Sequence, residues 1–114
     1  MMNDNISDLG LLNKALLKFR DERDWAQFHN SKDLAIALSI EASELLELFL
    51  WKKAQEVNED LLKEEIADVL SYCILLANNH NIDLKQAVLD KIELNRLKYP
   101  IEKAKGKSTK YNDL

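Results

Sequence analysis

Residues that break helices are rare in this sequence, because glycine and proline together supply only three of its 114 residues. A β-sandwich of this length needs a turn signal about every 8–12 residues, and glycine and proline supply many such signals. Domains typically take about 100–200 residues, so the chain has room for one. The sequence therefore predicts an all-α fold in which long helices are joined by short connections.

Apolar spacing and capping residues predict four helices. The first helix begins at Ser7 or Asp8, and the second runs from Lys32 to about Lys53 and is capped by Ser31. The third is capped by Asn58 and closed by residues 78–81, and the fourth is capped by Asp83 and ended by Pro100. We assign residues 1–100 to one four-helix domain. Residues 101–114 contain four lysines, and we expect them to form a flexible tail.

The second predicted helix is apolar on most of its circumference. Its large apolar side chains are Ile36, Leu38, Ile40, Leu45, Leu46, Leu48, Phe49, Leu50 and Trp51. A helix that is apolar on nearly all sides is normally buried, and a chain this short has little interior in which to bury it. We therefore expect the subunits to pack into a dimer or a dimer of dimers.

The charge distribution and the single cysteine exclude several classes of partner and location. The net charge is −4, and residues 1–97 hold 11 basic against 18 acidic side chains. So acidic a body repels a phosphate backbone, which argues against nucleic-acid binding. Cys73 has no partner for a disulfide, which fits a reducing cytoplasm. We find no signal peptide and no run of about 18 apolar residues, so no membrane segment is expected.

Two pairs of carboxylates interrupt the most apolar helices. Glu41 and Glu44 are three residues apart on the second helix, and Glu65 and Asp68 repeat this spacing on the third. Residues at i and i+3 share a helix face, so the pairs converge if the two helices are antiparallel. Four converging carboxylates repel one another unless a cation lies between them, and hard oxygen ligands suit Mg²⁺ or Mn²⁺.

Two other interpretations of these carboxylates must be weighed. Acidic residues at this spacing are common on solvated helix faces, where they bind no metal; Glu47 fits that description, or contributes a peripheral contact. A di-iron bundle needs a Glu-x-x-His pair, but His29 and His80 are preceded three positions earlier by Ala26 and Ala77. A site without histidine favours Mg²⁺ over iron.

The order of these motifs resembles the MazG-like nucleotide pyrophosphohydrolases, in particular the small single-domain branch that includes the dCTP pyrophosphatases. Three blocks carry the resemblance, which spans residues 9–100: Trp25-x-x-Phe28-His29, the EXXE…EXXD set formed by Glu41, Glu44, Glu65 and Asp68, and Lys91-Ile92-Glu93-Leu94-Asn95-Arg96-x-x-Tyr99-Pro100. One departure is Ala42-Ser43, where close relatives often have Val-Gly. The departure leaves the acidic residues intact but puts the dimensions of the pocket in doubt.

The resemblance implies a Mg²⁺-dependent enzyme that converts a nucleoside triphosphate into a monophosphate and pyrophosphate, with Mn²⁺ as a substitute. It assigns the metal and the catalysis to Glu41, Glu44, Glu65 and Asp68, and we favour Glu44 as the group that activates water. It assigns phosphate and sugar contacts to Lys91, Asn95 and Arg96. The candidates for base recognition are His29 and Trp51. Tyr72 and Tyr99 are candidate sugar contacts, and either could instead be a core aromatic residue.

Three functions are consistent with these residues. The first is the pyrophosphohydrolase just described, acting on deoxynucleotides with a pyrimidine preference such as dCTP, in cleaning the nucleotide pool. The second is the same chemistry on modified or damaged nucleotides. The third is a helical protein without catalytic activity that binds a partner. The four acidic residues in apolar helices argue against the third, because a purely structural protein gains nothing from them.

Overall fold

The computed structural model describes residues 7–53 and 56–114, and within these residues all regular structure is helical. Its four long helices confirm the predicted all-α fold. The chain divides into two compact units, residues 1–82 and residues 83–114. No helix in the described parts of the chain has the length and hydrophobicity that a membrane crossing requires.

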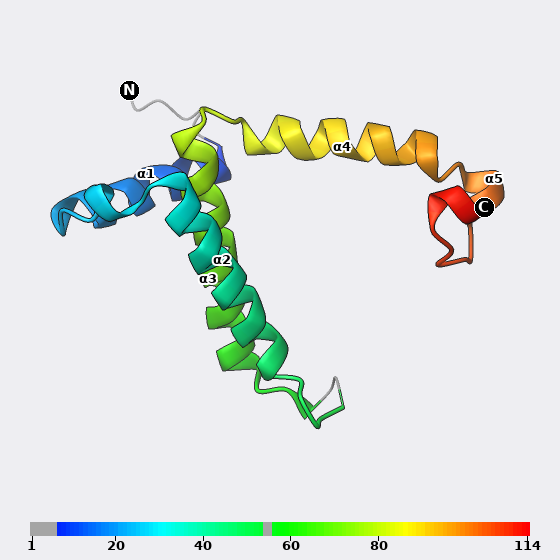
Figure 1. The fold of residues 1–114 in the computed structure, drawn as a ribbon, viewed down its shortest axis with the longest axis horizontal. Coiled ribbons are helices and arrows are strands. Elements are labelled where there is room, and N and C mark those ends of the chain that lie inside the picture. Colours follow the sequence, from blue (N-terminus) through cyan, green and yellow to red (C-terminus); the bar gives the residue numbers. More distant parts are fainter. Residues whose placement is uncertain (1–6, 54–55) are drawn as a thin grey trace. The chain divides into compact units, whose positions relative to one another are not determined.

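The first unit holds α1 (Asp8–Glu22), a turn of 3₁₀ helix η1 (Ala26–Phe28), α2 (Ser31–Glu47) and α3 (Glu59–Asn79). Helices α2 and α3 run antiparallel and pack along each other, and α1 packs on α3 (Figure 1). The connector between α1 and α2 contains the aromatic residues Trp25 and Phe28, and its only helical turn is η1. The antiparallel arrangement is the one that brings the two acidic motifs together.

Side-chain caps explain where these helices begin. Ser7 accepts a hydrogen bond from the N–H of Gly10, and the side chain of Asn58 accepts bonds from two N–H groups at the start of α3, as predicted. The predicted cap Ser31 is wrong. Asn30 caps α2 instead by accepting a bond from the N–H of Asp33 at 2.9 Å. Ser31 is therefore the first residue of the helix, and its hydroxyl is free to bond elsewhere.

The end of α2 also differs from the prediction, because the helix stops at Glu47 rather than near Lys53. Beyond Glu47 the backbone bonds tighten to an i→i+3 pattern: the N–H of Phe49 bonds to the carbonyl of Leu46 at 2.9 Å. Trp51 then takes a left-handed conformation with φ 64°, which a right-handed helix cannot contain. The apolar run continues through this turn, so apolar spacing alone could not locate the end of the helix.

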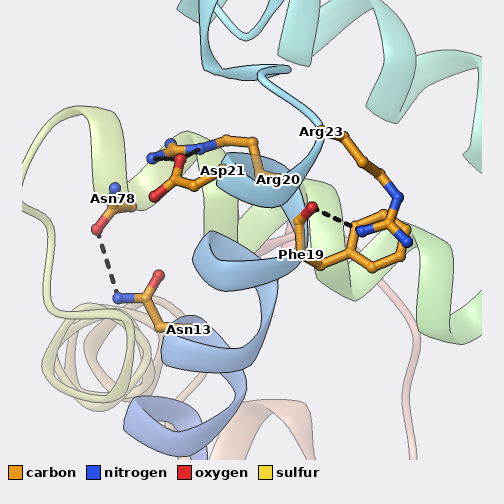
Figure 2. A network of polar contacts seen from close by, with 6 residues as sticks. All are labelled: Asn13, Phe19, Arg20, Asp21, Arg23 and Asn78. Carbon is orange, nitrogen blue, oxygen red and sulfur yellow. Dashed lines mark hydrogen bonds and ion pairs between the residues drawn. The ribbon is translucent and has the colours of Figure 1, made fainter.

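The interior of the first unit is small. Its buried apolar residues are Leu34, Ile74, Leu75 and Ala77, near the end where α2 begins and α3 finishes. Polar bonds tie the same end together: Asn13 of α1 bonds to Asn78 of α3 at 3.4 Å (Figure 2). Large apolar side chains elsewhere on α2 and α3 stay exposed, among them Ile36, Ile40, Leu46, Leu61, Ile66 and Leu70.

The second unit holds α4 (Leu84–Lys98), α5 (Ile101–Ala104) and a terminal 3₁₀ turn η3 (Tyr111–Asp113). Asp83 caps α4 by accepting a bond from the N–H of Gln86, as predicted. Tyr111 meets the ring of Tyr99 edge to face at 6.1 Å, and the ammonium of Lys98 lies 4.8 Å from the Tyr111 ring centre. The tail thus contains short helical turns, and its flexibility stays a prediction.

Candidate functional site

Three carboxylates from two helices meet in the first unit. Glu41 and Glu44 come from α2 and Glu65 comes from α3, and one oxygen from each lies within 4.8 Å of the others. The three-residue spacing places the first two on one face of α2, and the antiparallel packing of α3 turns Glu65 toward them. The structure thereby brings together three of the four acidic residues that the sequence singled out.

Glu41 is the carboxylate most affected by this crowding. Partial burial raises its pKa, and hydrogen bonding and charge repulsion from Glu44 add to the effect, followed by Asp68 and Glu65; together they bring the pKa to about 7. Glu41 therefore holds a proton more readily than an ordinary glutamate side chain does.

The cluster fits a divalent metal ion. Among the described residues, the Oε2 atoms of Glu41 and Glu65 are buried and have no hydrogen-bond partner. Buried carboxylate oxygens without donors are costly unless a cation or a proton satisfies them. Because the donors are all carboxylate oxygens, they suit the hard cations Mg²⁺ and Mn²⁺.

Asp68, the fourth predicted carboxylate, stands outside the group of three but acts on it. It lies one turn beyond Glu65 on α3, and its charge contributes to the raised pKa of Glu41. It also forms part of the wall of a pocket of about 170 Å³. Asp68 therefore connects the acidic cluster with this pocket.

The pocket is mostly aromatic and aliphatic. Its lining residues are Leu16, Phe19, Arg20, Trp25, His29, Asp68, Ser71, Tyr72 and Leu75. The pKa of the Tyr72 hydroxyl is raised by burial and then by the negative charges of Glu41, Asp68 and Glu44. Tyr72 is thus kept neutral beside the cluster, as a flat ring with a hydrogen-bonding end.

His29 reaches the pocket from the connector before α2. Burial and the nearby charge of Arg20 lower its pKa, and its buried Nδ1 atom has no hydrogen-bond partner among the described residues. The side chain of Asn79 donates a bond of 2.8 Å to the His29 carbonyl, and the Ser31 hydroxyl bonds to Nε2 of His80 at 2.7 Å. The end of α3 therefore holds this wall of the pocket in place.

Of the other residues predicted for the site, Trp51 belongs to the first unit, whereas Lys91, Asn95, Arg96 and Tyr99 belong to the second. Trp51 is fully exposed in the turn after α2 and does not line the pocket. Lys91, Asn95 and Arg96 are exposed on α4, where Arg96 forms an ion pair of 3.2 Å with Glu93. Tyr99 follows α4 and contacts Tyr111, as described above.

The sequence interpretation missed three residues that line the pocket. They are Phe19, Arg20 and Trp25, none of which was predicted as a site residue. The aromatic connector was a usable signal for Trp25. At the Ala42-Ser43 departure from the family pattern, the added Ser43 hydroxyl donates a hydrogen bond of 3.1 Å to the Ser39 carbonyl of its own helix.

Comparisons with known proteins show which proteins this chain resembles. A family described as MazG-like matches residues 36–114. The dCTP pyrophosphatase 1 proteins of Mus musculus and Homo sapiens are each 42% identical to this chain over the matched region. That region covers 85% of this chain and 62% of the length of each relative. A crystal structure of a pyrophosphatase from Archaeoglobus fulgidus superposes with a TM-score of 0.74 at 36% identity, covering 88% of this chain and 99% of that one.

Proposed function

This chain belongs to the MazG-like family, and from that premise we propose that it is a nucleotide pyrophosphohydrolase that cleaves nucleoside triphosphates between the α- and β-phosphates. The products are a nucleoside monophosphate and pyrophosphate. Relatives named dCTP pyrophosphatase support dCTP, or a related pyrimidine deoxynucleotide, as the substrate. The corresponding role is control or cleaning of the cytoplasmic nucleotide pool.

The observation that carries the proposal is a cation-fitting cluster directly beside an aromatic pocket. Glu41, Glu44 and Glu65 place their oxygens within 4.8 Å of one another, and Asp68 belongs to the wall of the pocket. A nucleoside triphosphate has the matching two halves, a polyanion and a flat base. The base fits the pocket of Trp25 and Tyr72, and the phosphates then lie toward the carboxylates.

The chemistry follows from these positions. Bound Mg²⁺ would neutralise phosphate charge and make an attacking water more acidic. Glu41, Glu44, Glu65 and Asp68 are proposed to hold the metal. Glu44 is proposed to orient a water molecule and accept its proton as the oxygen attacks phosphorus. The bond between the α- and β-phosphates then breaks, and pyrophosphate leaves with the electron pair.

Residues outside the pocket enter the proposal through the family resemblance. Lys91 and Asn95, with Arg96 beside them, are proposed to bind phosphate and sugar, since cations and amides are suitable donors to phosphate oxygens. Tyr99 is proposed to lie near the sugar, and Trp51, which does not line the pocket of its own chain, is proposed to contact the base. The side chains of these residues are exposed or half-exposed.

Assembly into a homodimer or a dimer of dimers is part of the same proposal. An apolar pocket of about 320 Å³ between α1 and α3 includes Leu12, Leu70 and Ile74, and the apolar side chains of α2 named above stay exposed. Patches of this kind are typical of subunit interfaces. Light scattering on the purified chain should give two or four times the mass of 13.2 kDa; a monomer at micromolar concentration would contradict this assembly.

A substrate panel tests the activity. The protein is incubated with each common dNTP and NTP plus Mg²⁺, and the phosphorus-containing products are separated by anion exchange. We expect dCTP or another pyrimidine nucleotide to give monophosphate and pyrophosphate. Diphosphate with orthophosphate would overturn the assigned bond, and no turnover of any nucleotide would overturn the enzyme proposal.

Substitutions test the site itself. Glu44→Gln and Asp68→Asn should each lower kcat by about 100-fold or more, because they remove groups that act on the reacting water or on the metal. Glu47→Gln is the matched control, since Glu47 is an exposed carboxylate on the same helix as Glu44. Full activity in both site variants would refute the assignment.

A further inference from the structure

Arg20 is a pocket residue that neither the sequence motifs nor the proposed mechanism uses. It lies near the end of α1, its side chain is only 17% exposed, and it lines the pocket with Trp25 and His29. The charge of Arg20 reaches His29, whose pKa it helps to lower. A guanidinium that is largely covered in an aromatic pocket calls for a role beyond solubility, because arginine side chains are mostly exposed.

Asp21 balances the charge of this guanidinium. Its Oδ1 atom accepts a hydrogen bond of 2.8 Å from Nε of Arg20 and lies 2.8 Å from Nη2 in an ion pair (Figure 2). Arg20 and Asp21 therefore form a nearly neutral pair. A guanidinium has five N–H donors in a rigid plane, so four remain after this one hydrogen bond.

The neutral pair distinguishes between the two kinds of acceptor that a nucleotide offers. Phosphate oxygens are best held by cations with unbalanced charge, which Arg20 is not. Base carbonyls and ring nitrogens are neutral acceptors, and a planar set of N–H donors matches their edge. Phe19 and Trp25 add flat apolar walls, and the unpartnered Nδ1 of His29 adds a further hydrogen-bonding position beside Arg20.

We propose that Arg20, held by Asp21, is a specificity-determining residue that donates hydrogen bonds to the acceptor edge of the nucleobase. The proposal rests on the proposed function for the identity of the ligand. The part of the ligand that Arg20 recognises is a neutral carbonyl or ring nitrogen that lies within an aromatic pocket. Purines and pyrimidines with different acceptor patterns are then distinguished by whether they satisfy these donors, because a buried donor left without a partner is unfavourable.

The test separates contacts to the base from contacts to the phosphates by direct binding. Titration calorimetry measures dCMP, and separately inorganic tripolyphosphate with Mg²⁺, on the whole chain. Arg20→Gln should weaken dCMP binding by about 10- to 100-fold, the range for a hydrogen bond from a charged group, and should leave tripolyphosphate binding unchanged. Lys18→Gln is the matched control, because Lys18 is an exposed cation of the same helix outside the pocket, and it should bind both probes as the wild type does.

Two more variants separate geometry from charge and guard against misfolding. Arg20→Lys keeps the positive charge but not the planar donors, so it should not restore dCMP affinity. Asp21→Asn keeps Arg20 but removes the carboxylate that holds its guanidinium, so it should weaken dCMP binding and leave tripolyphosphate binding unchanged. Equal loss of both probes in Arg20→Gln, unchanged dCMP affinity in that variant, or full dCMP affinity in Arg20→Lys would each overturn the proposal. Unchanged dCMP affinity in Asp21→Asn would overturn the positioning of Arg20 by Asp21.

The binding assay and the hydrolysis assay fail independently. If the wild type hydrolyses dCTP but Arg20→Gln binds dCMP equally well, the base contact is wrong and the proposed function stands. If dCMP binds in an Arg20-dependent way but no nucleotide is hydrolysed, the proposed function is wrong and the base contact stands. If the wild type binds no dCMP, the base contact is overturned whatever the hydrolysis assay shows.

Discussion

Replacing Glu41 with glutamine should stabilise the metal-free protein while it weakens metal binding. Glutamine keeps the size of the side chain and removes one of the crowded charges. Burial, followed by the neighbouring carboxylates, raises the pKa of Glu41 from 4.5 to about 7. Because the folded state then binds a proton more tightly than the unfolded state, ionising Glu41 opposes folding.

The sign and the size follow from these two pKa values. Below pH 4.5 Glu41 is protonated in both states and has no effect on the free energy of unfolding. As the pH rises from there through about 7, the folded wild type loses stability, and above 7 the loss is complete. The full difference in pKa corresponds to about 3 kcal/mol, and solvent screening of this partly exposed cluster reduces it to about 1–2 kcal/mol.

Thermal unfolding followed by circular dichroism measures this effect. In EDTA at pH 8, Glu41→Gln should melt about 4–8 °C above the wild type, and at pH 4.5 the two should coincide. Saturating Mg²⁺ at pH 8 should raise the melting temperature of the wild type more than that of the variant. Glu47→Gln is the control on the same helix, and protein concentration is held fixed. A variant that is less stable than the wild type in EDTA at pH 8 would refute the reasoning.

Three further predictions follow from the contacts around the site. Asn79→Ala removes the donor to the His29 carbonyl and should lower the free energy of unfolding in urea by about 1 kcal/mol; an unchanged midpoint would contradict the anchoring role. Asn58→Ala removes the cap of α3 and should cost about 0.5–2 kcal/mol in the same assay, whereas Asn58→Asp should cost little. By NMR, His29 should titrate below 6.5, and Arg20→Gln should move its pKa upward; equal values in both proteins would exclude the effect of Arg20.

Much of the fold could be predicted because its signals are local. Ser7, Asn58 and Asp83 each lie immediately before a helix and accept its first free N–H groups, which is a property of short sequence segments. The all-α class followed from the scarcity of glycine and proline. The three-residue spacing of Glu41 and Glu44 likewise fixed their shared face of α2.

The errors came from choices that a local pattern cannot make. Asn30 and Ser31 are both good caps, and the Ser31 hydroxyl is instead hydrogen-bonded to His80, which follows α3 and is distant in the sequence. The apolar run from Leu48 to Trp51 continues past the end of α2, so its periodicity extended the helix too far. Arg20 could not be predicted as a pocket residue from the sequence, because its sequence neighbours are charged. Only the packing of α1 on α3 brings it to the pocket.

Direct metal binding by adjacent glutamates tests the central claim that α2 and α3 build a cation site. Glu65 belongs to the cluster, whereas its neighbour Glu64 is exposed and outside it. Mn²⁺ binding, followed by electron paramagnetic resonance, should be at least about 10-fold weaker in Glu65→Gln than in the wild type, because a ligand to a hard cation is lost. Glu64→Gln should bind as the wild type does. Equal Mn²⁺ affinity in the two variants would contradict the site on which the proposed function depends.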